Sequence, residues 1–222
     1  MGMTMQRLQI SLPEWQYRFL QEQASRTGQS IAGLICNLIE QEARAVQRPM
    51  DGITLLDQIN RAKEDLGIKC SKYAGAITVQ FVRRAFREHG ISASPRDVFI
   101  KGVPIEIDLL IPRAGTSPEN GILYRPEDVL IALEIKNSGA FGEGAIRRIR
   151  KNFMTIQQHN KQIRCFYVTL AERKGYKWAV TEDNLGFPAY TLFWHSGSSK
   201  NRRYEPSGDL QRLINDISSE WP

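Results

Sequence analysis

The amino-acid sequence predicts a mixed α/β protein, in which a small amino-terminal domain precedes a larger α/β domain. Residues 129–133 form a continuous apolar run, which is typical of a strand that is covered on both faces. After residue 54, the sequence contains both segments with the spacing of helices and short apolar segments that are typical of strands. The first 46 residues instead contain one alternating segment and two helical patterns, which indicates a separate domain.

Composition limits the classes of protein to which this chain can belong. Its 222 residues are 41% hydrophobic and 24% charged, as is ordinary for a globular protein. No apolar run approaches the roughly 18 residues of a membrane span, and the start MGMTMQRLQI lacks the apolar segment of a signal peptide. The three cysteines form no CxxC pair. We therefore expect a cytoplasmic protein with no disulfides and no membrane partner.

The first 46 residues read as one strand followed by two helices. Apolar and polar residues alternate in RLQISLP, as in a half-buried strand. A helical pattern runs from Glu14 to Gly28, and Ser30 is placed to cap a second helix that extends to about Ala45. A strand and two helices of this length cannot bury a core alone. We therefore expect a homodimer in which two copies of the strand pair antiparallel.

The pattern RLQISLP, followed by a helix and then RTGQSIAGLICNLIE, resembles the ribbon-helix-helix family of DNA-binding domains. The resemblance covers roughly residues 5–46 of a domain that we place at residues 1–46. It implies a two-stranded ribbon that enters the major groove of DNA. By this resemblance Arg7, Gln9 and Ser11 would contact bases, and the helix start at Ser30 would bind a phosphate. The alternative is a dimerisation domain whose ribbon touches no DNA.

Residues 47–53 read as a linker, and the second domain spans residues 54–222. It opens with two expected helices, at residues 54–66 and 74–89. A third helix is expected at residues 144–160 and a last one at residues 208–218. Strands are expected at residues 98–100, 105–111, 129–136, 165–170, 177–180 and 190–194.

Three charged residues interrupt the apolar strands of the second domain. In ALEIKNSG, Glu134 and Lys136 are two positions apart and project from one face of a strand, while Ile135 points into the core. Asp108 interrupts the run IEIDLLI and reaches the same place if the two strands are neighbours. Two adjacent carboxylates repel each other and gain most from a divalent cation between them. A lysine beside them can orient or deprotonate a water, so the pattern predicts a metal site.

The run IEID and the later LEIKNSG resemble the PD-(D/E)xK nuclease superfamily, whose core has the order αβββαβ. The resemblance implies a restriction-endonuclease-like fold in which Asp108, Glu134 and the carbonyl of Ile135 hold Mg²⁺, with Mn²⁺ as a substitute. Lys136 would then serve the attacking water. Gln80 stands where many members have a glutamate, so the site has fewer carboxylates and the nuclease is either weakened or degenerate. The alternative is a Glu–Lys cross-strand pair at a sheet margin.

The formal charge of +6 makes DNA a plausible partner, and much of the positive charge follows Lys136 along the chain. In the helix expected at residues 144–160, we expect Arg147, Arg150 and Lys151 to contact the DNA backbone. The sequence thus predicts a Mg²⁺-dependent DNA endonuclease that the amino-terminal domain positions as a homodimer. Two alternatives stay open: a DNA-binding regulator with a degenerate nuclease fold, and a structure-selective resolvase of the Holliday-junction type.

Overall fold

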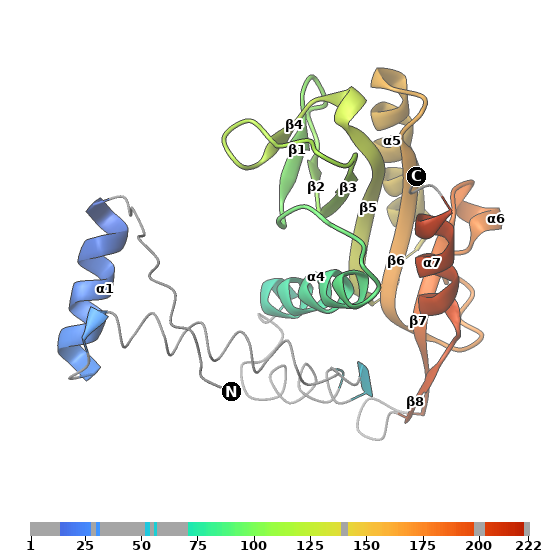
Figure 1. Cartoon of the computed structure of the whole chain (residues 1–222). Coiled ribbons are helices and arrows are strands. Elements are labelled where there is room, and N and C mark those ends of the chain that lie inside the picture. The colour runs from blue at the N-terminus through green and yellow to red at the C-terminus, as the bar shows by residue number, and fades with distance from the viewer. Residues whose placement is uncertain are drawn as a thin grey trace, which may run out of the picture. The chain divides into compact units, whose positions relative to one another are not determined.

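The computed structural model describes residues 14–27, 30–31, 52–53, 56, 71–138, 142–197 and 203–219 (Figure 1). The chain divides into two compact units, Met1–Pro49 and Met50–Pro222. This division falls within the segment that the sequence predicts as a linker. Among the helices that are described, none combines the length and the apolar character needed to cross a membrane.

The amino-terminal unit contributes the helix α1, Glu14–Thr27. The helix begins at the residue where the sequence predicts it. Its charges suit the helix dipole, because Glu14 lies in the first turn and Arg26 in the last. An exposed ion pair of 2.6 Å joins Glu14 to Arg18 one turn later.

The predicted ribbon and almost all of the second predicted helix lie outside the described residues. This applies to the three residues expected to contact bases, Arg7, Gln9 and Ser11. Ser30, the expected phosphate contact, is described and its side chain is exposed. The ribbon-helix-helix arrangement therefore stays a prediction.

The second unit contains most of the described helices and strands. Its elements are α4 (Ser71–Glu88), β1 (Val98–Ile100), β2 (Glu106–Ile107), β3 (Leu109–Pro112), β4 (Leu123–Tyr124), the 3₁₀ helix η2 (Pro126–Asp128), β5 (Val129–Ser138), α5 (Glu143–His159), β6 (Arg164–Arg173), α6 (Glu182–Leu185), β7 (Ala189–Ser196), β8 (Arg203–Pro206) and α7 (Asp209–Ser218).

The main sheet has five strands in the order β3-β5-β6-β7-β8. The central strands β5, β6 and β7 run parallel, and the edge strands β3 and β8 are antiparallel to their neighbours. A parallel pair needs a crossover connection, which α5 supplies between β5 and β6. A smaller sheet has the order β2-β1-β4.

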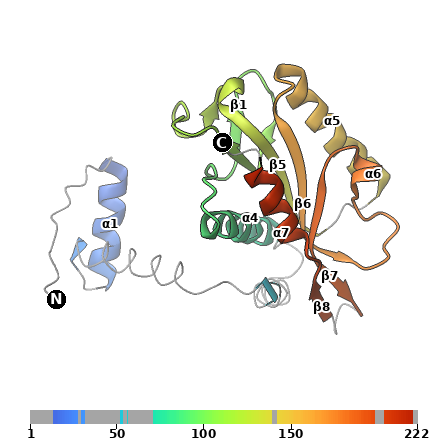
Figure 2. The same ribbon diagram turned by 45° about the vertical axis from the view of Figure 1, so that its right-hand side comes forward.

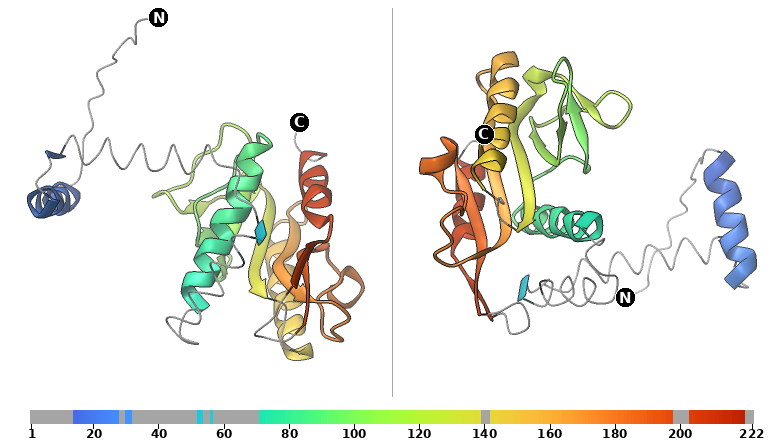
Figure 3. Two further views of the ribbon diagram at one scale, coloured as in Figure 1. Left: turned by 90° about the horizontal axis from the view of Figure 1, so that it is seen from below. Right: turned by 180° about the vertical axis from the view of Figure 1, so that it is seen from behind.

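Helices cover both faces of the main sheet (Figures 1 and 2), and Figure 3 gives the same arrangement from below and from behind. On one face, α4 and α7 pack against a core that includes Leu133, Ile135 and Val168. On the other face, α5 packs against a core that includes Ala132 and Tyr167. The buried residues of α5 recur every three or four positions and form one apolar stripe: Ile146, Ile149, Phe153 and Ile156.

The predicted α/β class and the αβββαβ order are confirmed. The helix α4 precedes the three predicted strand segments, and α5 and β6 follow them. The second segment differs in one respect, because it is divided at Asp108 into β2 and β3. β2 pairs with β1 in the small sheet, whereas β3 pairs with β5 in the main sheet. Asp108 therefore lies where the chain passes from one sheet to the other.

One predicted strand does not form. Residues 173–179 instead form two tight turns, in which Tyr176 N donates to Arg173 O at 3.1 Å and Ala179 N to Tyr176 O at 3.0 Å. Gly175, at a φ of 73°, permits the first reversal of the chain. Thr181 then caps the amino end of α6, so a strand cannot continue past residue 180. The apolar spacing near Trp178 resembles a strand, but these local hydrogen bonds decide the outcome.

Two strands, β4 and β8, were not predicted. β8 continues a basic segment at residues 196–203 for which no strand was expected, yet it pairs antiparallel with β7, from Phe193↔Pro206 to Ser196↔Arg203. A polar sequence suits this position because β8 is the edge of the sheet and its side chains are mostly exposed. Polar edge strands carry little of the hydrophobic signal from which strands are predicted.

Candidate metal centre

Asp108 faces the strand that carries the other two predicted site residues. The antiparallel register pairs Leu109 with Leu133, which places Asp108 across from Glu134. The Ile135 backbone N–H donates a hydrogen bond of 2.7 Å to Asp108 Oδ2. This bond fixes the carboxylate of Asp108 against the edge of β5.

Glu134 and Lys136 project from the same face of β5. Their neighbours Leu133 and Ile135 belong to the core beneath α4 and α7. Side chains alternate along a strand, so Glu134 and Lys136 point to the opposite face, which α5 covers. Lys136 Nζ lies 2.6 Å from Glu134 Oε1 and 3.4 Å from Asp108 Oδ2. The structure thus brings the three predicted charged side chains together.

The site is partly buried, and this changes the proton affinity of its groups. The side chains of Asp108, Glu134 and Lys136 are 22%, 18% and 40% exposed. Burial raises the pKa of Glu134 and outweighs the attraction of Lys136, and the nearby charge of Asp108 adds to the rise. For Lys136, burial acts to lower the pKa, but Glu134 and Asp108 together raise it above its ordinary value. Lys136 is therefore an ammonium cation at neutral pH.

These groups fit a hard divalent cation. Within the described part of the chain, Asp108 Oδ1 and Glu134 Oε2 accept no hydrogen bond, so each carboxylate keeps one oxygen for a ligand. Mg²⁺ is commonly bound by one or two carboxylates and retains several waters. No group of three or more His, Cys, Asp or Glu side chains with the arrangement of a metal site occurs among the described residues. The donor set thus suits Mg²⁺ or Mn²⁺ better than a closed Zn²⁺ site.

Gln80 is not brought to these three residues. It lies in α4, and its side chain is exposed. The buried side of the helix is marked by Ala74, Thr78 and Val82, and Gln80 is about 200° around the helix from the latter two. The resemblance to the nuclease superfamily places Gln80 in the expected helix, and α4 contains it. The helix is rotated so that the side chain of Gln80 points away from the sheet.

The basic residues of α5 divide into different roles. Arg147 is exposed and lies 3.8 Å from Glu143, and Lys151 is exposed. Arg150 instead donates to two backbone carbonyls of α6, to Leu185 O at 2.8 Å and also to Asn184 O. Its guanidinium joins α5 to α6, so the expected DNA contact at Arg150 competes with a structural role.

Arg148 is a residue that sequence reasoning did not single out. Its positive charge lowers the pKa of Glu134, although less strongly than Lys136 does. Burial and the charge of Asp108 act in the opposite direction and raise this pKa. The four basic residues of this helix look equivalent in the sequence, and only the structure shows that the charge of Arg148 acts on Glu134.

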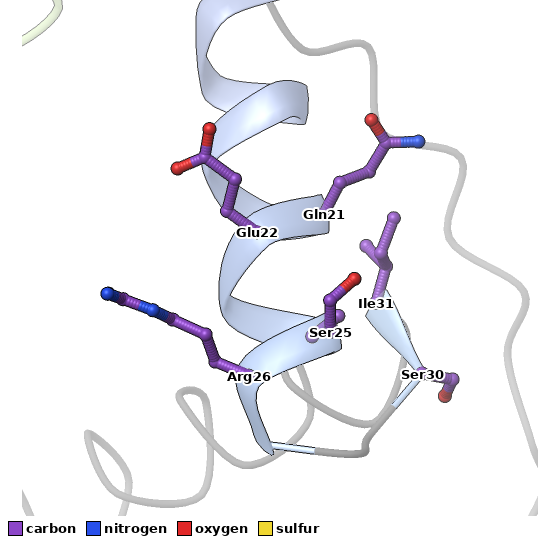
Figure 4. Close-up of a pocket in the computed structure, with 7 residues that line it drawn as sticks. Gln21, Glu22, Ser25, Arg26, Ser30 and Ile31 are labelled. Atoms are coloured by element: carbon purple, nitrogen blue, oxygen red, sulfur yellow. The ribbon is translucent and has the colours of Figure 1, made fainter.

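A separate concavity lies in the amino-terminal unit, at the end of α1 (Figure 4). Its lining residues are Gln21, Glu22, Ala24, Ser25, Arg26, Ser30 and Ile31. Among the described lining residues Glu22 is the single carboxylate, so this part of the concavity has no paired acidic groups of the kind that bind a divalent cation.

No protein-family model matches this chain, and no curated protein matches it. Among solved structures, it is similar to NucC of P. aeruginosa in its cAAA-bound form, with a TM-score of 0.48 and 11% identity over 78% of this chain and 93% of that chain. It is also similar to NucC of E. coli in its apo form, with a TM-score of 0.43 and 14% identity over 75% and 89% of the two chains. The cAAA-bound form of the E. coli protein gives a TM-score of 0.45 and 14% identity over 78% and 93%.

Proposed function

We propose that this protein is a Mg²⁺-dependent endonuclease that hydrolyses phosphodiester bonds of DNA. The observation that supports this most directly is the convergence of Asp108, Glu134 and Lys136 at one partly buried place, with Lys136 Nζ 2.6 Å from Glu134 and 3.4 Å from Asp108. A cross-strand ion pair needs only one acid and one base. The second carboxylate, held by a backbone N–H, is what a metal site requires in addition.

Asp108 and Glu134 would hold the ion, and the carbonyl of Ile135 is the proposed third oxygen. When bound, Mg²⁺ or its substitute Mn²⁺ lowers the pKa of a coordinated water and stabilises negative charge on a phosphoryl group. Lys136, as an ammonium group, orients the attacking water and stabilises charge on the reacting phosphate. Its raised pKa argues against a role as the general base while it remains paired with both carboxylates.

The proposed DNA contacts lie beside this centre. Arg147, Arg148 and Lys151 are exposed on α5, the helix that covers the same face of the sheet. Such side chains neutralise phosphates and carry no sequence information of their own. We assign sequence reading to the predicted ribbon and its Arg7, Gln9 and Ser11, and the pairing of two ribbons to a homodimer.

A second candidate is a DNA-binding regulator that retains a nuclease fold without cleavage. The observation in its favour is the small number of acidic ligands, because the side chain of Gln80 is exposed and cannot add a charge. Glu88, about two turns further along α4, does not replace Gln80 as an acidic group of the site. Its side chain is exposed and pairs with Arg84 at 3.0 Å. The two candidates differ in whether the site binds a divalent ion and cuts DNA.

The test is a cleavage assay on supercoiled plasmid, linear duplex and a four-way junction, each with Mg²⁺, Mn²⁺ or EDTA. We expect cleavage that needs the divalent ion and is lost in Asp108→Asn and Glu134→Gln. The matched control is Glu205→Gln, which removes an exposed carboxylate paired with Lys174 at 2.8 Å, outside the site. Preference for the junction would indicate a resolvase. Wild-type protein that neither binds Mn²⁺ nor cuts any of the three DNAs would favour the regulator.

A further inference from the structure

Two buried hydroxyl groups lie next to the proposed metal centre on the neighbouring strand. In the parallel register of β5 and β6, Tyr167 pairs with Glu134 and Thr169 pairs with Lys136. Adjacent strands are separated by about 5 Å, so these residues are lateral neighbours. Tyr167 belongs to the core beneath α5, which places its side chain on the same face as Glu134 and Lys136.

By distance and angle, neither hydroxyl has a hydrogen-bond partner among the described residues, although Thr169 Oγ1 lies near enough to Tyr167 Oη to lower the pKa of the phenol. Tyr167 is 0% exposed and Thr169 is 1% exposed, yet Tyr167 Oη and Thr169 Oγ1 make no hydrogen bond of acceptable distance and angle. Buried polar groups in proteins are nearly always paired, and an unpaired one is costly. By contrast, Tyr190 in the adjacent strand β7 donates to Asp216 Oδ2 at 2.7 Å. A water molecule between the two hydroxyls would complete their hydrogen bonds.

The surroundings of Tyr167 are acidic. Burial raises its pKa most, Thr169 opposes the rise, and the charges of Glu172, Glu134 and Asp108 add to it. The phenol therefore stays protonated and available as a hydrogen-bond donor. Glu172 is 5% exposed; its Oε1 accepts the Arg173 backbone N–H at 2.8 Å, and its Oε2 has no partner. Two of these buried polar atoms, Tyr167 Oη and Thr169 Oγ1, thus belong to residues that pair with Glu134 and Lys136, and Glu172 lies further along the same strand.

We propose that Tyr167 is a positioning residue for Glu134, which it orients through an enclosed water molecule held together with Thr169. This inference rests on the proposed function. An enclosed water needs two to four polar partners, and Tyr167 Oη, Thr169 Oγ1 and Glu134 Oε1, which also accepts from Lys136, would supply them, so that Glu134 Oε2 stays open for the ion. A ligating carboxylate that is held by such an outer contact presents its free oxygen to the ion in a fixed direction. Tyr167 itself touches neither the ion nor the substrate.

The test measures binding of Mn²⁺ alone to the full chain by calorimetry, together with the melting temperature of the metal-free protein. Tyr167→Phe and Thr169→Val should each weaken Mn²⁺ binding by about 10- to 100-fold, the usual effect of losing an outer-shell contact. Neither should lower the melting temperature, because each removes a hydroxyl that has no protein partner. Thr169→Ser keeps a hydroxyl and should retain the affinity.

Tyr190→Phe is the matched control. It removes the hydrogen bond to Asp216, so it should lower the melting temperature and leave Mn²⁺ binding unchanged. Cleavage by Tyr167→Phe should recover when Mg²⁺ is raised to saturation, since only the affinity for the ion is reduced. Mn²⁺ binding to Tyr167→Phe as tight as to the wild type would overturn this inference alone. Wild-type protein that binds no Mn²⁺ would overturn the proposed metal centre beneath it.

Discussion

The side chain of Lys136 contacts both carboxylates of the proposed metal centre. Its ammonium group contacts Glu134 Oε1 at 2.6 Å and Asp108 Oδ2 at 3.4 Å, and so offsets part of the repulsion between two carboxylates. A divalent ion would offset the same repulsion. Lys136 and the ion therefore compete for one pair of acidic groups, although both are needed for the proposed cleavage.

This competition predicts an unusual result for Lys136→Met. Cleavage should fall by about 10²- to 10³-fold, the range for losing one electrostatic stabiliser of the transition state. Mn²⁺ affinity should stay the same or increase, because the ammonium group no longer holds Glu134 and Asp108. Plasmid cleavage and calorimetry measure the two effects, and Lys174→Met, which breaks the exposed pair with Glu205, is the control. Weaker Mn²⁺ binding by Lys136→Met would mean that the lysine holds the carboxylates in place.

Glu172 predicts a dependence of stability on pH. Burial raises its pKa, and the hydrogen bond from the Arg173 backbone N–H opposes this only in part. The folded protein thus keeps the proton at pH values where the unfolded chain has released it. The contribution to stability is complete below the ordinary carboxyl pKa and is lost as the pH rises through the raised value.

Between about pH 4 and pH 7, the wild type should therefore lose more stability than Glu172→Gln, whose amide does not titrate. Melting temperatures measured across this range give the comparison. Glu205→Gln, a change at a carboxylate with 57% exposure, should run parallel to the wild type. A constant difference between Glu172→Gln and the wild type at every pH would contradict the prediction.

At the level of single elements, the sequence was informative where charge interrupts an apolar strand. Asp108, Glu134 and Lys136 stand out because charge in a strand covered on both faces needs a reason, and the structure brings all three together. The rotation of a helix leaves no comparable signal in the sequence. For this reason Gln80 was predicted as a site residue although its side chain is exposed. Tyr167 looks like an ordinary core residue, since its importance depends on the register between β5 and β6. Register between distant strands is a tertiary property.

Two basic residues of α5 have different environments: Arg150 donates to backbone carbonyls of α6, and Lys151 is exposed. Their substitutions should therefore have different effects. Arg150→Ala should destabilise the protein by about 1–2 kcal/mol, because it removes the hydrogen bonds to Leu185 O and Asn184 O. Lys151→Ala should leave stability unchanged but weaken binding to all DNA sequences and reduce its salt dependence by about one unit of slope. Thermal melts and binding titrations at several salt concentrations distinguish the two. A stability loss in Lys151→Ala equal to that in Arg150→Ala would refute the division.

At the scale of the whole molecule, the order of elements was predictable because long apolar runs and helical stripes repeat over many residues. The prediction failed where few residues decide the structure, as in the turns at residues 173–181 and the polar edge strand β8. The amino-terminal unit adds a different question. Its described helix α1 exposes two aromatic side chains, Tyr17 at 46% and Phe19 at 55%. They lie two positions apart, about 200° around the helix, so one side of α1 can bury one of them against a partner.

The last prediction concerns that partner, a second copy of this chain. The predicted strand at residues 5–12 has backbone donors and acceptors that a symmetric copy would satisfy, and one exposed aromatic residue of α1 would be buried in the same contact. Removing residues 1–49 should therefore give a monomer by light scattering, and DNA binding should weaken because two linked sites become one. The remaining unit keeps its own apolar cores, so its circular dichroism should stay that of a folded protein. A dimer mass that survives the truncation would place the interface on the second unit and remove the reason for a paired ribbon.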